Sequence, residues 1–475
     1  MADSVVILGA GPAGLACAHR ILRDSGKRVV IVDKAPVVGG AGASFGWKGH
    51  TLDYGPHAFH TRGDEPEQLV RSLFASDPEV LLEGRKQVHV YLKGKRFRYP
   101  LQVREALLKF NPILSLRIIA EFVITSIFHA LVSIPIDNFE NWGRTRFGGT
   151  LYQMSFGDYT EKVWKTSPAK ISEKFASEKI QGFNFVNLVK RLLRIGGQVT
   201  EPYYQTWIYH RHGSGRIYDR MAQEIRARGG EILLGADIKA IPIDDKRVRC
   251  VSIEQGGAPR GLPCETLVST IGLPQLVKLM GDGVPFSVRH AASKLAYTSL
   301  VLVYLEFDVE RVSDDHWFYL LEKEFAFNRV TEQKNLSPHT MEPGKTVLSL
   351  ELTCRVGDDL WRKSDEEVFE LAKQDCRRIH FVPVERITGY VVKRVPNVYE
   401  IYYKHFDQHA DVVLGHLREL ENVVSIGRRG LFLQGDMHQA VEMGLAMGSL
   451  LAAETPDRDG VRRFYERYVR YVDHN

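Results

Sequence analysis

The sequence predicts an α/β protein with a parallel β-sheet, a second mixed β-sheet and a helical region. Apolar runs at residues 4–8 and 28–32 flank an alanine-rich helical segment, which is the pattern of a β-α-β unit. Residues 100–200 show helical periodicity, whereas residues 297–405 are rich in alternating β-branched and aromatic residues. A chain of 475 residues usually forms more than one hydrophobic core, so we expect several domains.

The predicted domains are interleaved along the chain. Short apolar runs at residues 231–234 and 266–270 supply two further strands far downstream of the first β-α-β unit. We therefore expect one discontinuous nucleotide-binding domain, interrupted by a helical subdomain and a β-rich substrate domain. The predicted boundaries are 1–99, 201–295 and 411–475 for the discontinuous domain, 100–200 for the helical subdomain and 296–410 for the β-rich domain.

Composition narrows the classes of partner. The chain has 63 Lys and Arg against 58 Asp and Glu, a net charge of +5 without a dominant basic block. This balance argues against nucleic acid and favours an anionic small molecule. Five widely spaced cysteines argue against a disulfide framework or a zinc site. We expect no metal, a reducing cytoplasmic compartment and no signal peptide. Homo-oligomerisation stays open.

One apolar stretch, residues 122–134, stands out within the helical region. It is shorter than the roughly 20 residues that span a bilayer, so we expect no membrane span. A buried or partly buried helix is our main interpretation. A surface that docks on a membrane or on a partner protein is the alternative.

A glycine-rich turn follows the first predicted strand. Gly9, Gly11 and Gly14 fit GxGxxG between a strand and a helix, where they permit the tight turn, the approach to a pyrophosphate and close helix packing. The helix N-terminus offers free N–H groups to the phosphates. Asp33 ends the second strand, where an acid accepts hydrogen bonds from ribose hydroxyls. Pro12 and Ala13 within the turn, and Lys34 after the acid, complete this predicted site.

A second glycine-rich segment follows the acid directly. It contains Gly39, Gly40 and Ala41, and here the sequence resembles the superfamily of FAD-dependent amine oxidases and UDP-galactopyranose mutases. The resemblance implies a Rossmann-like fold with FAD as cofactor. It also implies that Gly427 and Arg428 approach the pyrophosphate, since a guanidinium pairs well with phosphate oxygens. By the same resemblance, Ile238 contacts the adenine.

Further blocks resemble the UDP-galactopyranose mutases in particular. GPHAFHT at 55–61 is similar to their GPHxFHT, YTEKVW at 159–164 to their YTEKQWG, and DMHQ at 436–439 to their DMHQ. A short basic hairpin at 93–100 and Arg329 also fit their pattern. These blocks lie in family order from residue 5 to about residue 450.

The mutase resemblance implies a reaction and a set of site residues. In that family, reduced flavin N5 attacks the anomeric carbon of a nucleotide sugar, and pyranose and furanose forms interconvert. The reductant can be NAD(P)H. The implied catalytic residues are His57, Arg329 and Asp436, of which His57 and Asp436 also contact the cofactor with Met437. The implied substrate-binding residues are His60, Arg98, Tyr159, Trp164, Tyr399 and Gln434.

The chain departs from the mutase pattern at three places. Gln434 replaces a tyrosine two positions before the DMHQ aspartate, and Lys165 replaces the glycine after the tryptophan. Residues 180–185 lack the arginine that this segment carries in the mutases. We therefore expect a nucleotide sugar other than UDP-galactose, or a different reaction. Arg96, Arg98, Lys165 and Arg429 are candidates to replace the missing cation.

Two other interpretations remain open. An FAD-dependent oxidase or desaturase of the amine oxidase or protoporphyrinogen oxidase type would take hydride from a C–H or C–N bond and would need an apolar pocket. A non-catalytic flavoprotein is the third interpretation. Ser44 and Ser214 lie beside glycines but outside a GxSxG elbow, so we predict turn residues and no hydrolase triad.

Overall fold

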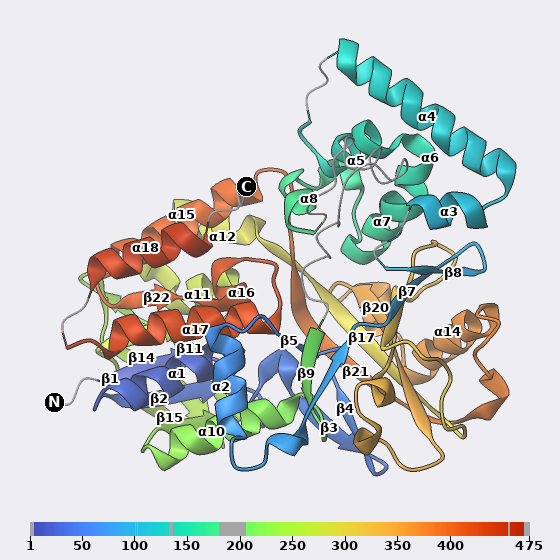
Figure 1. The fold of residues 1–475 in the computed structure, drawn as a ribbon. Helices are drawn as coiled ribbons and strands as arrows, with labels where there is room; N and C mark the ends of the chain where they lie inside the picture. Colours follow the sequence, from blue (N-terminus) through green and yellow to red (C-terminus); the bar gives the residue numbers. More distant parts are fainter. Residues whose placement is uncertain are drawn as a thin grey trace. The chain divides into compact units, whose positions relative to one another are not determined.

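The computed structural model describes residues 4–99, 101, 103–132, 136–179, 206–454 and 457–469. The chain forms two compact units, each built from separate stretches of sequence. The first unit contains residues 1–83, 206–296 and 406–475, and the second contains residues 84–205 and 297–405. Figure 1 shows the elements of both units.

The first unit is organised around a five-stranded parallel sheet in the order β10-β2-β1-β16-β22. Its strands are rich in valine, isoleucine and leucine and are largely buried, as expected for a parallel sheet covered on both faces. The strands are β1 (Ser4–Leu8), β2 (Arg28–Asp33), β10 (Glu231–Leu234), β16 (Thr266–Ser269) and β22 (Val423–Ser425).

Helices α1 (Pro12–Asp24) and α17 (Met437–Ala452) pack closely in this unit (Figure 1). Small residues allow this approach: a Cβ on Gly444 would lie 2.3 Å from the Ala13 carbonyl oxygen. The other helices are α2 (Glu65–Leu73), α10 (Gly215–Ala227), α11 (Leu273–Met280), α12 (Phe286–Lys294), α15 (Phe406–Glu419), α16 (Gly427–Leu431) and α18 (Arg458–Tyr468). The smaller strands are β3 (Ser44–Trp47), β4 (His50–Asp53), β5 (Phe59–His60), β9 (Thr206–His210), β11 (Ala236–Ala240), β14 (Cys250–Gln255) and β15 (Ala258–Pro263).

The second unit contains a seven-stranded mixed sheet in the order β21-β17-β20-β19-β18-β7-β8. β18 and β7 run parallel, whereas β17, β20, β19 and β18 pair antiparallel in turn. The strands are β7 (Val88–Leu92), β8 (Lys95–Arg98), β17 (Ala296–Phe307), β18 (Trp317–Leu320), β19 (Arg329–Glu332), β20 (Thr346–Cys354) and β21 (Ile387–Ile401).

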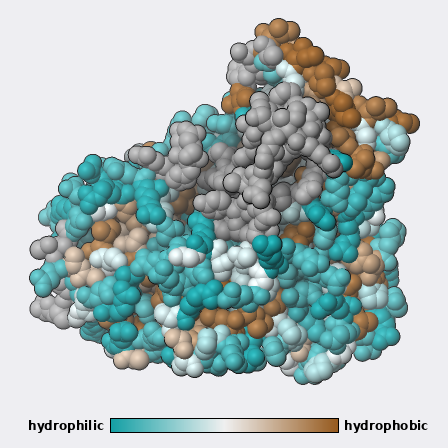
Figure 2. Space-filling model, in the orientation of Figure 1, coloured by the Kyte–Doolittle hydropathy of each residue, from teal (hydrophilic) through white to brown (hydrophobic). Residues whose placement is uncertain are grey.

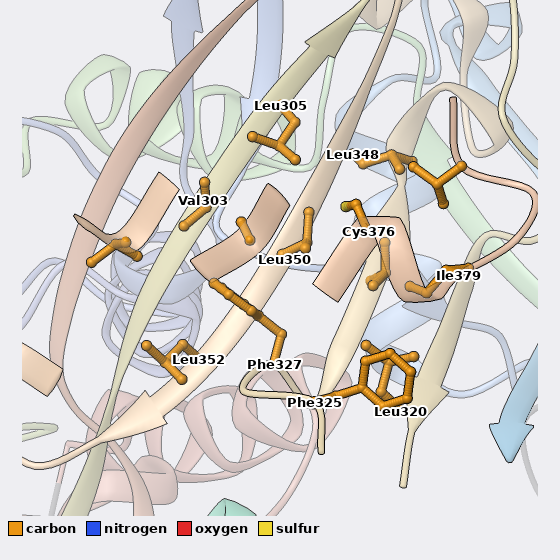
Figure 3. Close-up of a cluster of buried hydrophobic side chains, with 14 of the residues drawn as sticks. Val303, Leu305, Leu320, Phe325, Phe327, Leu348, Leu350, Leu352, Cys376 and Ile379 are labelled. Atoms are coloured by element: carbon orange, nitrogen blue, oxygen red, sulfur yellow. The ribbon is translucent and has the colours of Figure 1, made fainter. Parts of the chain in front are cut away.

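One face of this sheet packs against α14 (Asp365–Arg378) and forms a hydrophobic core. Figure 3 shows Leu350 of β20 beside Cys376 of α14, and Val303 of β17 belongs to the same cluster. Side chains alternate between the two faces of a strand, so Ser349, Glu351 and Thr353 of β20 belong to the opposite face. We call the part of this opposite face on β19 and β20 the polar face; it carries the candidate site of this unit.

The helical part of the second unit follows β8. Its helices are α3 (Val103–Lys109), α4 (Pro112–Leu131), α5 (Phe139–Phe147), α6 (Gly149–Tyr152), α7 (Asp158–Trp164) and α8 (Lys174–Lys179). Asn111 caps α4 by accepting a hydrogen bond from the Leu114 N–H, and Pro112 occupies its first turn.

The structure confirms the α/β fold class and corrects two expectations. Residues 84–99 belong to the second unit, because β7 pairs with β18 instead of extending the parallel sheet. Of the apolar run predicted at 122–134, residues 122–131 belong to a longer helix, α4, which begins at Pro112; their described side chains are partly buried or exposed, and none is fully buried. Within the predicted helical region 100–200, residues 180–200 lie outside the described residues.

Candidate functional site

The carboxyl ends of β1, β16 and β22 meet at one edge of the parallel sheet, and the GxGxxG turn follows β1 at this edge. Gly9 has a φ of +105°, and a Cβ there would lie 2.2 Å from Thr270 Oγ1. A Cβ on Gly14 would lie 2.0 Å from the Gly9 carbonyl oxygen. The first and third glycines are therefore required by the backbone of the protein itself.

Gly11 differs from its two neighbours in the motif. A Cβ on Gly11 would meet no described atom within 4 Å, so the backbone borders open space. This is the position at which the fingerprint needs a glycine for close approach of a pyrophosphate. Asp33 holds the turn, accepting hydrogen bonds from the N–H groups of Ala10 at 2.7 Å and Ala35 at 2.8 Å.

The second glycine segment docks directly on the first. The Gly39 N–H donates to the Ala10 carbonyl at 2.8 Å, and a Cβ on Gly40 would lie 3.3 Å from the Gly11 Cα. Gly39 and Gly40 have φ of +98° and +54°, which few residues other than glycine adopt easily. Gly40 and Ala41 are exposed beside the turn.

Segments from the far end of the chain reach the same place. A Cβ on Gly427 would lie 2.9 Å from the Ala13 Cβ, which brings the beginning of α16 to the beginning of α1. Met437, at the start of α17, accepts a hydrogen bond on its sulfur from the Tyr218 hydroxyl at 3.1 Å. A Cβ on Gly42 would lie 3.0 Å from that sulfur.

His60 and Asp436 are neighbours in this unit. His60 Nε2 lies 3.9 Å from Asp436 Oδ2, and the rings of His60 and His438 have centroids 5.9 Å apart. Asp436 is exposed at the N-terminus of α17, where its N–H donates to Gln439 Oε1. His57 is half-buried, two residues after Gly55.

Asp53 anchors the segment that leads to His57, a role that sequence reasoning missed. It is fully buried and accepts hydrogen bonds from the Ser44 hydroxyl at 2.5 Å, the Tyr209 hydroxyl at 2.6 Å and the Ser214 N–H at 3.2 Å. Burial raises the pKa of Asp53 to about 6, although these hydrogen bonds act to lower it. Ser44 and Ser214 therefore serve this anchor.

In the second unit, the polar face of the mixed sheet carries a buried ion pair. Arg329 and Glu351 lie directly opposite each other on β19 and β20. Arg329 Nε donates to Glu351 Oε1 at 2.6 Å, and one terminal nitrogen donates to Oε2 at 2.8 Å. The same terminal nitrogen donates to the Tyr399 hydroxyl at 3.3 Å. Among the described residues, the other terminal nitrogen, NH1, has no hydrogen bond.

Aromatic side chains surround this arginine. Trp164 is buried, and its ring meets the rings of Tyr399 and Phe175 edge to face at 6.2 and 5.2 Å. The rings of Tyr159 and Tyr319 meet at 6.0 Å. Burial raises the pKa of Tyr159 well above its ordinary value, so its hydroxyl stays protonated.

Lys162 fixes α7, which carries Tyr159 and Trp164. Its buried ammonium donates to the carbonyls of Leu320, Glu322 and Phe327 at 2.6, 2.9 and 3.0 Å. Burial lowers the pKa of Lys162 to about 7. This lysine of the YTEKVW block therefore positions the two aromatic residues.

The comparison with protein families agrees with this geometry. Residues 12–453 match the flavin-containing amine oxidoreductases. The chain belongs to this family. It is therefore an FAD-dependent enzyme of the amine oxidase superfamily.

Individual relatives differ in their reactions. The chain is 25% identical over 290 residues to a 4,4'-diapophytoene desaturase of a Methylomonas species, covering 54% of this chain and 52% of the relative. It is 25% identical over 298 residues to an all-trans-retinol 13,14-reductase of Macaca fascicularis, covering 57% and 47%. The chain thus spans about half the length of the curated relatives it matches.

Solved structures extend the fold comparison over the whole chain. A reduced UDP-galactopyranose mutase is 18% identical, with a TM-score of 0.84, covering 98% of this chain and 97% of that one. A putrescine oxidase bound to putrescine is 15% identical, with a TM-score of 0.62, covering 94% and 98%. These likenesses establish the amine oxidoreductase fold.

The described residues fit the FAD of this family. The open backbone at Gly11 and the exposed Gly40 suit a pyrophosphate, and the Asp33 oxygens keep lone pairs for ribose hydroxyls. Arg428 is half-buried next to Gly427, and its contact with the phosphates remains a prediction. Ile238 is half-buried in β11 and Lys34 is exposed after β2, so their predicted contacts with FAD remain predictions.

Other predicted site residues have different outcomes. Arg96 pairs with the fully buried Asp315 at 2.7 Å through one terminal nitrogen, so its role as a substitute cation remains a prediction. Arg98 is exposed in β8, and Gln434 is half-buried just before α17. Lys165 follows Trp164 with a φ of +51°. Arg429 is half-buried in α16. The segment 180–185 lies outside the described residues.

Proposed function

We propose that this flavoenzyme is a sugar-nucleotide mutase that interconverts the pyranose and furanose forms of a nucleotide sugar. When bound in its reduced state, the flavin would supply the nucleophile, N5, for displacement at the anomeric carbon. The reaction is an isomerisation, so no electrons are gained or lost over a turnover. The observation that carries this proposal is the placement of Arg329, which is a fixed cation within an aromatic cluster.

The diphosphate is the leaving group in this chemistry, and it gains negative charge as the anomeric C–O bond breaks. Arg329 can donate both hydrogens of NH1 to the diphosphate while Glu351 holds the other edge of the guanidinium. Such a preorganised donor stabilises developing charge without reorganisation. Tyr399, which accepts from Arg329, would be a second diphosphate contact.

The aromatic residues would position the sugar and the base. Trp164 and Tyr159 project from α7, whose orientation Lys162 fixes. The protonated Tyr159 hydroxyl can donate to a sugar or phosphate oxygen. The mutase resemblance also implies substrate contacts at His60, Gln434 and Arg98.

Proton transfers accompany the opening and closing of the sugar ring. An imidazole can accept and return a proton, and His57 would do so on the flavin side of the sugar. Asp436, exposed at the N-terminus of α17, would be held there by the helix dipole and would bind the flavin together with Met437.

The names of the curated relatives support a second candidate, an FAD-dependent oxidase or desaturase. Those relatives are a desaturase and a reductase, and both names describe oxidation or reduction of a carbon skeleton. An enzyme of this kind would take up or release electrons in every turnover. It would not need a cation for a diphosphate.

One assay separates the two candidates. The purified holoenzyme would be reduced with dithionite under nitrogen and incubated with a panel of UDP-, GDP- and dTDP-sugars. The mutase proposal expects a ring isomer, detected by anion-exchange chromatography, and none with the oxidised enzyme. No isomer from any sugar, together with peroxide formation on a C–H or C–N substrate in air, would favour the oxidase.

A further inference from the structure

Helix α4 has an exposed apolar face that the flavin site does not use. On α4, apolar residues recur every three or four positions, so they form one stripe along the helix. Ile113 and Leu131, near its two ends, are 82% and 80% exposed. We name as the α4 apolar face the exposed residues Ile113, Leu116, Ile119, Val123, Ile124, Ile127, Phe128 and Leu131. Figure 2 shows apolar residues gathered along this helix.

The opposite side of α4 is held by the protein. Near the first turn, the Ser115 hydroxyl donates to the Leu107 carbonyl at 2.7 Å. At mid-helix, Glu121 accepts from the Thr150 N–H at 2.6 Å and from the Thr150 hydroxyl at 2.7 Å. Ile118 is buried on this side.

These contacts decide how α4 can meet a membrane. By length and composition alone α4 could cross a bilayer. Only 6% of its most apolar stretch, Pro112–His129, is buried inside the protein. A spanning helix needs lipid or apolar protein on all sides within the hydrocarbon core. Because polar contacts with α6 hold one side, the helix can lie in the plane of the interface with its apolar face in the lipid.

Basic residues accompany the apolar face. Between residues 95 and 131 the chain has six Lys and Arg but two Glu, a net charge of +4. Arg117 is 68% exposed on α4, one position after Leu116. Lys109 lies just before α4, and Lys95 of β8 donates to its carbonyl, which brings the hairpin cations to this end of the helix.

We propose that the α4 apolar face docks on a lipid bilayer that carries anionic headgroups. Apolar side chains would enter the boundary between headgroups and acyl chains, while the exposed cations that accompany α4 pair with the headgroups. A second copy of the chain is a poorer occupant, because a two-fold contact along this face would bring the same cations of both copies together. Membrane docking by α4 and the cations that accompany it does not depend on which reaction the enzyme catalyses.

Vesicle flotation tests this inference with the full-length holoenzyme. The protein would be mixed with vesicles of phosphatidylcholine alone, or with about a third phosphatidylglycerol, and floated on a density gradient. We expect the protein to float with the anionic vesicles at least tenfold more than with the neutral ones. Raising the salt from about 0.1 to about 0.5 M should weaken this binding.

Two matched variants locate the binding surface. Leu116→Glu with Ile124→Glu places two charges on the α4 apolar face, at positions that are already exposed. Phe286→Glu with Val412→Glu places two charges on exposed apolar residues of the first unit. The α4 variant should lose at least tenfold in vesicle binding, whereas the control variant should bind like the unmodified protein. Both should retain flavin and the unmodified melting temperature.

Two results would overturn the proposal. One is that the unmodified protein stays with the dense fractions at every lipid composition, or that the α4 variant floats as well as the control. The other is that the unmodified protein does not float but forms a stable dimer in solution, measured by light scattering, whereas the α4 variant is a monomer. That second result would assign the face to a second copy of this chain.

Discussion

Arg329 and Glu351 form a two-point ion pair across β19 and β20, at a register position where the two residues lie directly opposite each other. Glu351 is 1% exposed and Arg329 is 19% exposed. The carboxylate therefore sits beneath the guanidinium and holds its orientation. In this account Glu351 is a positioning residue, and Arg329 is the residue that contacts the diphosphate.

Substitutions at this pair should separate binding from stability. Arg329→Lys keeps the charge but loses the fork, so we expect the Kd of a nucleoside diphosphate to rise about 10- to 100-fold, or about 1.5–3 kcal/mol. Glu351→Gln leaves the arginine without its carboxylate and should lower the free energy of unfolding by about 3 kcal/mol. Calorimetric titration with UDP and GDP, and urea unfolding, measure the two effects.

A double variant provides the control for this prediction. Arg329→Met with Glu351→Met replaces the whole pair by apolar groups, which is often neutral for stability. It should therefore unfold near the urea concentration of the unmodified protein but bind no nucleoside diphosphate. Unchanged diphosphate affinity in Arg329→Lys and in the double variant would remove Arg329 from the site.

Lys162 should be among the most sensitive positions of the second unit. Lys162→Met leaves three carbonyls, two of them in buried hydrogen bonds, without their donor, so we expect a loss of about 3–5 kcal/mol in the free energy of unfolding. Lys323 is a matched control, since it is exposed and pairs with Glu161 at the surface. Lys323→Met should cost less than about 1 kcal/mol. Equal losses would mean that the three hydrogen bonds do not stabilise α7.

The buried carboxyl of Asp53 predicts a dependence of stability on pH. Its folded-state pKa of about 6 lies above the ordinary value near 4, so the folded protein binds the extra proton between these limits. The contribution is present below about pH 4 and is lost as the pH rises through about 6, by up to about 3 kcal/mol. Asp53→Asn should remove this falling limb from the pH profile of urea unfolding.

The exposed Asp237 offers a control for the Asp53 measurement, because its substitution by Asn should leave the profile unchanged. Other buried carboxyls, such as Asp375, titrate in both proteins and cancel in the difference. If Asp53→Asn and the unmodified protein show parallel profiles from pH 4 to pH 7, then Asp53 ionises normally in the folded state.

Two glycine substitutions should have contrasting effects on the cofactor and on the fold. A Cβ on Gly11 meets open space, so Gly11→Ala should keep the apoprotein within about 1 kcal/mol in stability but weaken FAD binding at least tenfold. A Cβ on Gly444 would press into the backbone of α1, so Gly444→Ala should destabilise the protein by at least about 2 kcal/mol. Flavin fluorescence titration and thermal unfolding distinguish the two.

The prediction would be contradicted if Gly11→Ala bound FAD with unchanged affinity. It would also be contradicted if Gly444→Ala had no effect on unfolding. Either result would show that the open space at Gly11, or the close packing of α1 on α17, does not have the role assigned to it.

Much of the first unit could be predicted because its signals are local. The turn at Gly9 follows a strand and precedes a helix within a few residues, so the β-α-β unit is readable from the sequence. The approach of Gly427 to Ala13 depends on strand order in the sheet, and only the motif resemblance indicated it.

The second unit was less predictable because its key pairs are distant in sequence. Glu351 is the charged residue in the buried strand 346–354, and a charge in such a strand indicates that it has a partner. The partner itself, Arg329, follows from the register of β19 and β20, which the sequence alone does not specify. Lys162 belongs to the YTEKVW motif, but the motif does not specify its three carbonyl partners on a distant part of the chain.

The apolar helix shows a different kind of failure. Arg117 and Glu121 interrupt the hydrophobic run, so the predicted run began only at residue 122 and seemed too short to span a bilayer, whereas α4 begins at Pro112. In the structure the two charges pair one turn apart, and Glu121 turns toward α6. The stripe is continuous on the other side, where periodicity and not run length would have found it.

Positional isotope exchange tests the central claim most directly. The holoenzyme would be incubated with a nucleotide sugar that carries ¹⁸O in the bridge between the anomeric carbon and the diphosphate. If the bond breaks and re-forms, the label must scramble into the non-bridging oxygens of that phosphate, and it should do so only when the flavin is reduced. A label that stays in the bridge for every sugar, in reduced and oxidised enzyme alike, would contradict the mutase.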